Sequence, residues 1–86
     1  MNITTENQFR EACIFAVSRY YNMELMSPLD TDDVFIVWQC KTLQNFKAMA
    51  STNISDGRYF EITYNGDKQE LYLDVYTKEQ NICIEV

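Results

Sequence analysis

Two alternating stretches joined by Asn65-Gly66 constrain the fold of this chain more than any other feature. From Arg58 to Tyr64, and again from Leu71 to Tyr76, apolar residues alternate with polar or tyrosine residues. A period of two is typical of half-buried strands, because successive side chains point to opposite faces. Asn-Gly is the strongest short hairpin signal, since both residues tolerate positive φ in a tight turn. The sequence therefore predicts an antiparallel hairpin centred on Asn65-Gly66.

An amphipathic helix is predicted before these strands. Thr5 and Gln8 match a capping box, in which each side chain satisfies a free amide of the first helical turn. The helix should end near Asn22 or Met23, ahead of Pro28, because the residue before a proline disfavours helix. Its apolar stripe, at spacings of three and four, consists of Phe9, Cys13, Ala16, Val17 and Tyr20.

Three further segments have strand character. Val34 to Cys40 begins apolar on both alternating sets, which predicts an interior strand covered on both sides. A turn at Thr42 to Gln44 should lead into a second strand, about Asn45 to Thr52. A last turn at Lys78 to Asn81 should precede a short final strand containing Ile82, Ile84 and Val86.

Together these elements predict one α+β domain spanning residues 1–86. The N-terminal helix is expected to pack on one face of a four- or five-stranded antiparallel β-meander. The helix stripe should bury five side chains of the long hairpin: Phe60, Ile62, Leu71, Leu73 and Val75.

Charge and composition narrow the range of partners. The net charge is −6 and the pI is about 4.4, so counterion release would contribute little to nucleic-acid binding. A protein with a basic groove is a better electrostatic match. No apolar run approaches the roughly 20 residues that cross a bilayer, and the start of the chain lacks the pattern of an export signal. With three widely spaced cysteines, we expect a cytoplasmic protein that binds neither nucleic acid nor membrane.

Residues with catalytic chemistry are scarce. The chain has no histidine, the usual general base and the commonest metal ligand. Cys13 and Cys83 have apolar neighbours and are expected to be small core residues. Asp30, Asp32 and Asp33 resemble a calcium loop only in part, because the glycine and distal glutamate are missing. We therefore expect no catalytic activity, no cofactor and no bound metal.

The face of the sheet opposite the helix is the candidate site. Tyrosine is enriched at binding interfaces because it combines a large rigid area with one polar tip. The alternatives are a half-solvated sheet face without a partner, in which tyrosine only suits strand propensity, and a homodimer interface. The candidate partner-binding residues are Trp38, Lys41, Asn45, Lys47, Tyr59, Glu61, Tyr72, Asp74 and Tyr76.

The second half of the chain resembles a family of small uncharacterised proteins encoded by phages and prophages of Gram-positive bacteria. The resemblance rests on Trp38-x-Cys40-Lys41, Leu43-Gln44-Asn45-x-Lys47-Ala48, Ser51-Thr52, Asp56-Gly57-x-Tyr59-x-Glu61 and Tyr64-Asn65-Gly66-Asp67-Lys68. It implies a phage accessory protein acting in the bacterial cytoplasm and carries over no catalytic residues.

Two functions follow as hypotheses. In the first, the chain is a non-enzymatic protein that binds and inhibits or modulates a host protein, which could belong to an anti-phage defence system such as a CRISPR-type system. In the second, it is an oligomeric module that binds a small ligand such as a nucleotide signal. Lys41, Lys47 and Arg58 would then contact the anion, and the tyrosines or Trp38 would stack on the base.

Overall fold

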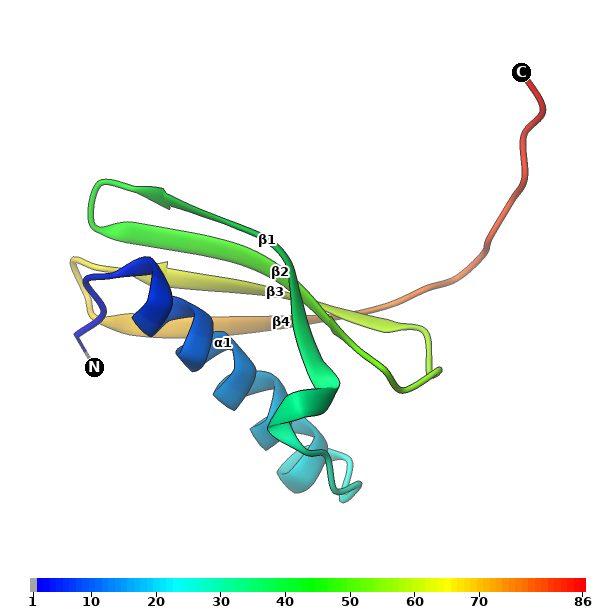
Figure 1. Cartoon of the computed structure of the whole chain (residues 1–86), viewed down its shortest axis with the longest axis horizontal. Helices are drawn as coiled ribbons and strands as arrows, with labels where there is room; N and C mark the ends of the chain where they lie inside the picture. Colours follow the sequence, from blue (N-terminus) through cyan, green and yellow to red (C-terminus); the bar gives the residue numbers. More distant parts are fainter. Residues whose placement is uncertain (1) are drawn as a thin grey trace.

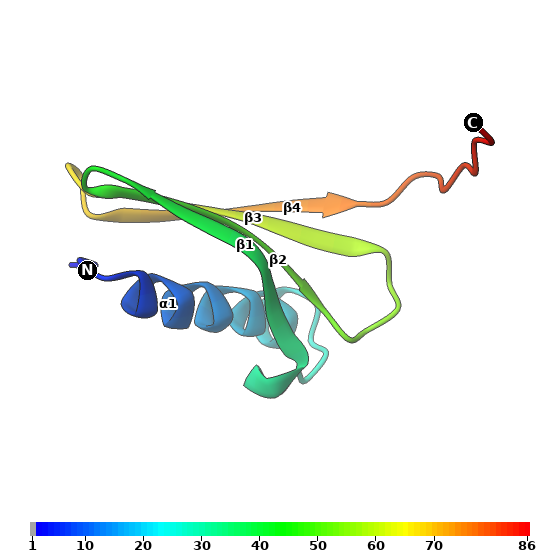
Figure 2. The same ribbon diagram turned by 45° about the horizontal axis from the view of Figure 1, so that its top comes forward.

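In residues 2–86, which the computed structural model describes, one α-helix lies across one face of a four-stranded antiparallel sheet (Figures 1 and 2). The predicted α+β architecture is confirmed. The strand order is β1-β2-β3-β4, so each strand pairs with its neighbours in sequence. The elements are α1 (Glu6–Arg19), β1 (Val34–Thr42), β2 (Asn45–Thr52), β3 (Arg58–Asn65) and β4 (Glu70–Thr77).

The start of α1 is fixed by the predicted capping box. The Thr5 hydroxyl accepts a hydrogen bond from the Gln8 backbone N–H at 3.1 Å, and the Gln8 side chain accepts one from the Thr5 N–H at 3.2 Å. The helix continues through a π-helical turn, Tyr20–Glu24. An i→i+5 turn keeps residues four to five apart on one face. Tyr21 therefore follows Val17 into the core, whereas Tyr20 is only half-buried.

The core lies between α1 and the inner faces of β2 and β3. Every second residue of these strands is buried, as the alternation predicts. Alanines at positions 48 and 50 leave room for the helix, and Phe9 of α1 stacks on Phe46 with ring centroids 5.1 Å apart. The buried residues of these two strands are Phe46, Ala48, Ala50, Thr52, Phe60, Ile62 and Tyr64.

The prediction that Val34 to Cys40 is an interior strand was wrong. The strand order places β1 at an edge of the sheet, and α1 covers only its inner face. Val34 and Ile36 point inward, but Phe35, Val37 and Trp38 are 44%, 55% and 43% exposed. The pairing with β2 shifts by one residue between Ile36 and Trp38, which marks a β-bulge at Val37. Apolar composition alone did not separate an edge strand from a central one.

The β3–β4 hairpin exists, but its turn differs from the predicted two-residue turn. Asn65 pairs with Glu70, so four residues form the loop. The Asn65 side chain accepts hydrogen bonds from two loop amides, and the left-handed residue is Gln69 at φ +54°. Gly66 is required for a different reason: a Cβ there would lie 2.1 Å from the Gln44 carbonyl oxygen. A contact with the neighbouring hairpin thus selects this glycine.

Two further predictions were wrong: the helix does not bury the inner side chains of β4, and no fifth strand forms within residues 2–86. Leu71 and Leu73 are half-buried and Val75 is 37% exposed, because α1 packs mainly against β1 and β2. Among the described residues, 78–86 form no strand and extend away from the sheet (Figure 1). Cys83 lies in this segment and is exposed, so it is not a core residue. Within residues 2–86, no helix has the length and apolar character needed to span a membrane.

Candidate functional site

The sheet face turned away from α1 carries most of the predicted binding residues; we call it the outer face. The strand register aligns Tyr59 with Tyr76, Glu61 with Asp74, and Thr63 with Tyr72. In β2, Lys47 and Met49 pair with Thr63 and Glu61 and continue the same face. Beyond the bulge, Trp38 pairs with Met49. The outer-face residues are Phe35, Trp38, Cys40, Lys47, Met49, Tyr59, Glu61, Thr63, Tyr72, Asp74 and Tyr76.

A stacked tyrosine pair lies on the outer face, next to the last residue pair of β3 and β4, Arg58 and Thr77. The rings of Tyr59 and Tyr76 have centroids 5.0 Å apart and an angle of 10° between their planes. Tyr76 is 40% exposed and Tyr72 is 46% exposed, so part of each phenol faces solvent. Stacking restricts the side-chain rotamers before any partner binds, which lowers the entropy that binding would cost. The pair is a rigid, partly apolar platform.

Carboxylates surround the tyrosines. Glu61 forms an ion pair with Lys47 at 3.3 Å, and its pairing partner Asp74 is exposed. The Tyr72 hydroxyl donates a hydrogen bond to Glu70 at 2.7 Å, which raises the pKa of Tyr72. The negative charge of Glu61, followed by burial and Asp74, raises the pKa of Tyr76. Both phenols therefore stay protonated at neutral pH, and the surface is acidic.

The bulge at Val37 adds an aromatic strip to the outer face that sequence patterning missed. Residues three apart on a regular strand lie on opposite faces. The extra residue in the bulge allows both Phe35 and Trp38 to point outward. Nothing in the alternation of apolar residues marks this bulge, so the predicted site lacked Phe35.

Lys41 does not lie on the outer face. Its ammonium group donates to the Leu43 carbonyl and lies 5.6 Å from the centroid of the Phe46 ring, on the side of the sheet that faces α1. This difference could have been predicted, because Lys41 is three residues from Trp38 with no bulge between them. The Asn45 side chain is already used within the fold, because its oxygen accepts a hydrogen bond from the Gly66 N–H at 2.8 Å.

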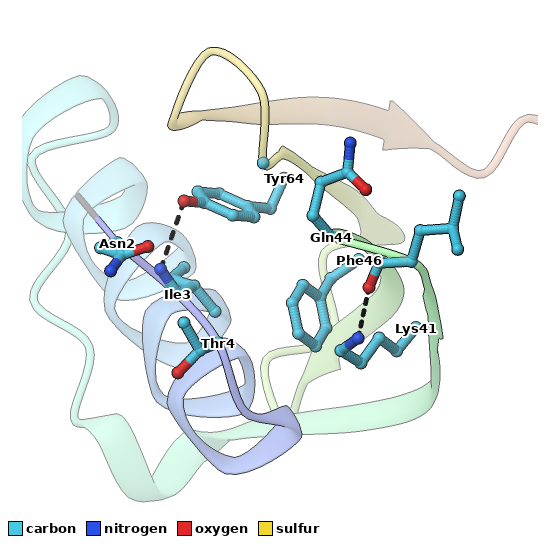
Figure 3. Close-up of a pocket in the computed structure, with 9 residues that line it drawn as sticks. Asn2, Ile3, Thr4, Lys41, Gln44, Phe46 and Tyr64 are labelled. Carbon is cyan, nitrogen blue, oxygen red and sulfur yellow. Dashed lines mark hydrogen bonds between the residues drawn. The ribbon is translucent and has the colours of Figure 1, made fainter.

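Lys41 instead lines a pocket of about 460 Å³ between the N-terminal residues and the β1–β2 hairpin (Figure 3). The Ile3 N–H donates to the Tyr64 hydroxyl across this pocket at 3.2 Å. Gln44 closes the far side and its amide donates to Asp67 at 2.6 Å. Several polar groups along the pocket are therefore already hydrogen-bonded within the protein.

The three cations of the ligand-binding hypothesis are separated and paired. Lys41 and Lys47 lie on opposite faces of the sheet. Arg58 lies at the other end of β3 from the residue that pairs with Lys47, about 17 Å away at the usual rise per residue. The Arg58 guanidinium binds Asp56 at 2.9 Å.

Asp56 holds the end of the helix against the β2–β3 loop. It accepts hydrogen bonds from the Tyr21 hydroxyl at 2.6 Å and from the backbone and side chain of Arg58. Burial disfavours the charged carboxylate, but these hydrogen bonds outweigh it and lower the pKa of Asp56. Burial and the bond to Asp56 raise the pKa of Tyr21. This cluster therefore stabilises the fold, and Arg58 belongs to it.

The cysteines and acids do not converge on a metal site. Cys13 is buried in α1, where burial raises the pKa of its thiol to about 12. Cys40 and Cys83 are exposed on β1 and in residues 78–86. In residues 2–86, no three cysteine, aspartate or glutamate side chains lie close enough to hold a metal ion together.

The profile of a family of unknown function (DUF6275) matches residues 10–86. The chain belongs to this family. The match covers most of α1, the whole sheet and residues 78–86, and so extends well beyond the half of the chain that carried the sequence resemblance. No curated protein and no solved structure matches the chain.

Proposed function

We propose that this chain is a non-enzymatic binding module that uses the outer face to contact another protein. The observation that carries the proposal is the Tyr59–Tyr76 stack, in which Tyr59 is half-buried and Tyr76 is 40% exposed, on a sheet face that the helix leaves uncovered. Rigid aromatic side chains contribute much of the free energy at protein interfaces. Trp38 and Phe35 extend the aromatic area toward β1.

The charge of the outer face indicates the chemistry of the partner. Glu61, Asp74 and Glu70 outnumber Lys47 around the tyrosines, and the whole chain carries −6. A surface rich in arginine or lysine would be attracted over a distance and could place a cation over a tyrosine ring. The proposed partner therefore has a basic contact surface.

The biological setting of the proposal comes from the sequence resemblance. A phage accessory protein in the bacterial cytoplasm would bind and inhibit or modulate a host protein, and a CRISPR-type defence protein is one such target. Defence proteins that hold nucleic acid have basic grooves, which an acidic surface can occupy. The alternative, a nucleotide-binding module, has less support because Lys41, Lys47 and Arg58 do not converge.

The proposal is tested by affinity purification from a bacterial host at near-physiological salt. Tyr59→Ala combined with Tyr76→Ala should abolish recovery of the partner, because the aromatic platform is lost. Arg10→Ala, on the exposed side of α1, is the matched control and should recover the partner as the native chain does. Circular dichroism should show that all variants fold.

Two results would contradict the proposal. One is equal recovery by the double tyrosine variant, which would place the contact elsewhere. The other is recovery of no partner by the native chain combined with thermal stabilisation by a nucleotide, which would favour the small-ligand module instead.

A further inference from the structure

The two edges of the sheet differ in how they are protected from pairing. An edge strand offers a row of free N–H and C=O groups to any further strand. The bulge at Val37 interrupts this row on β1, and bulges discourage edge-to-edge pairing. On β4 the register with β3 runs without a break from Thr77 to Glu70, and the strand contains no proline. Within residues 2–86, no strand covers the other side of β4.

The inner face of β4, which is on the same side of the sheet as α1, is apolar and only partly covered by other residues. Leu71, Leu73 and Val75 face the same side as α1, but the helix packs mainly against β1 and β2. Leu71 and Leu73 are consequently only half-buried, and Val75 is 37% exposed. A further strand beside β4 would complete the hydrophobic core if its inward side chains were apolar.

Residues 82–86 have the sequence of such a strand. Ile82, Ile84 and Val86 are β-branched, alternate with Cys83 and Glu85, and suit one buried face. They are exposed, with Ile82 at 69% and Ile84 at 76%. Alternation would place these three β-branched side chains on one side of a strand, and such an exposed apolar stripe favours a partner. The segment also belongs to the region that matches the family.

The course of the chain directs this segment away from its own β4. The Lys78 N–H donates to the Gly57 carbonyl at 2.6 Å, so the strand direction continues past Thr77. The segment then extends beyond the end of the sheet (Figures 1 and 2). The turn predicted at Lys78 to Asn81 does not form within the described residues 2–86, and this stretch contains neither the glycine nor the proline that tight reversals favour.

We propose that two copies of this chain exchange residues 82–86, each segment pairing with β4 of the other copy. A two-fold axis reverses the direction of the second β4, so the segment runs antiparallel to it and needs no turn. Ile82, Ile84 and Val86 then lie beside the half-exposed Leu71, Leu73 and Val75. Exchange of an identical element is a low-cost route to a closed dimer, because both copies use the same two surfaces.

The net charge gives this dimer an unusual salt dependence. Each copy carries −6, so the two copies repel each other over a distance of about 30 Å in buffer of about 0.01 M ionic strength. Added salt screens this repulsion without weakening apolar contacts. The exchange dimer therefore becomes tighter as ionic strength rises, whereas the proposed contact between the acidic outer face and a basic partner becomes weaker.

Sedimentation equilibrium of the full chain over a wide concentration range tests the exchange, together with hydrogen–deuterium exchange of amides 82–86. The native chain should dimerise, and these amides should become protected only in the dimer. Ile84→Asp should raise the dissociation constant by roughly a hundredfold, since two buried isoleucines are lost per dimer. Cys83→Ser, on the other side of the same segment, should leave the dimer unchanged. Val75→Lys should also weaken the dimer, because it places a charge on β4 where the exchanged segment is proposed to pack.

Three results would overturn the exchange. A chain that stays monomeric with unprotected amides leaves the segment without a partner. A monomer with protected amides shows that the segment folds back onto its own β4. A dimer that survives Ile84→Asp uses another surface, such as the outer face. Ile84 is exposed in the single copy, so its substitution leaves the outer-face site intact and the two proposals fail separately.

Discussion

Neighbouring residues of β3 and β4 lie on two faces that differ in what covers them. Phe60 and Ile62 are fully buried beneath α1, whereas Tyr59 and Glu61 lie on the outer face beside Tyr76 and Asp74. The two faces share the same backbone and both contain aromatic residues. Within residues 2–86, only the inner face has a second layer against which to pack. Burial depends on that layer, so the same side-chain type stabilises the fold on one face and is available for recognition on the other.

The largest expected difference between the two faces is the loss of unfolding free energy when an aromatic ring is removed. Phe60→Ala should reduce the free energy of unfolding by about 3–5 kcal/mol, because the ring contacts Tyr20 and Tyr21 and leaves a cavity. The adjacent Tyr59→Ala should cost less than about 1.5 kcal/mol. Urea unfolding of the two variants makes this comparison. Equal losses would mean that the outer face is as buried as the inner one.

A second expected difference concerns alkaline pH. Burial raises the pKa of Cys13 from 9.0 to about 12, so the folded thiol keeps its proton where the unfolded thiol loses it. The contribution of the Cys13 thiol to the free energy of unfolding is therefore fully present below pH 9.0. It is lost as the pH rises toward 12, because the unfolded chain releases the proton first. At pH 10.5 the free energy of unfolding should be about 2 kcal/mol lower than at neutral pH because of this group.

Comparison of Cys13→Ala with the native chain isolates this contribution. Urea unfolding at pH 7 and pH 10.5 should show a smaller alkaline loss for the variant. Cys40→Ala, on the exposed strand β1, should lose as much stability as the native chain. An unchanged alkaline loss in Cys13→Ala would assign the effect to tyrosine or lysine ionisation.

The tyrosine stack should contribute modestly to stability. A double-mutant cycle with Tyr59→Ala and Tyr76→Ala should give a coupling free energy of about 0.5–1.5 kcal/mol, as expected for stacked rings beyond their buried area. A coupling near zero would indicate that the stack does not persist in solution. The outer face would then lack a preorganised platform.

The smallest expected effect is that of the Lys47–Glu61 ion pair. Lys47→Ala should change the free energy of unfolding by less than about 1 kcal/mol, since the pair is partly exposed and water screens it. The same substitution should still alter partner binding, because it removes the cation beside the tyrosine platform. Lys41→Ala is the comparison on the other face and should not affect the partner. An opposite ranking of the two lysines would move the contact surface toward the N-terminal pocket.

The parts of the fold that depend on local pattern were predictable. The capping box of Thr5 and Gln8, the bounds of β2 and the in–out alternation of β3 agree with the sequence. Most of the candidate residues lie on the outer face, because alternation fixes the face of each side chain once the register is set. Lys41 lies on the opposite face. Its spacing of three residues from Trp38 along a regular strand predicts this position. The sequence predicts a binding role for Asn45, yet its side-chain oxygen accepts a hydrogen bond from the Gly66 N–H in the β3–β4 loop.

The sequence by itself determined which residues alternate, where α1 begins, and which side of β3 and β4 carries the tyrosines. These features depend on contacts between near neighbours in the chain. Only the tertiary structure decided that β1 is an edge strand with a bulge at Val37, that Gly66 serves the approach of Gln44, and that β4 is partly uncovered. Each of these depends on what lies beside a residue in space, and a linear pattern of apolar side chains does not contain that information.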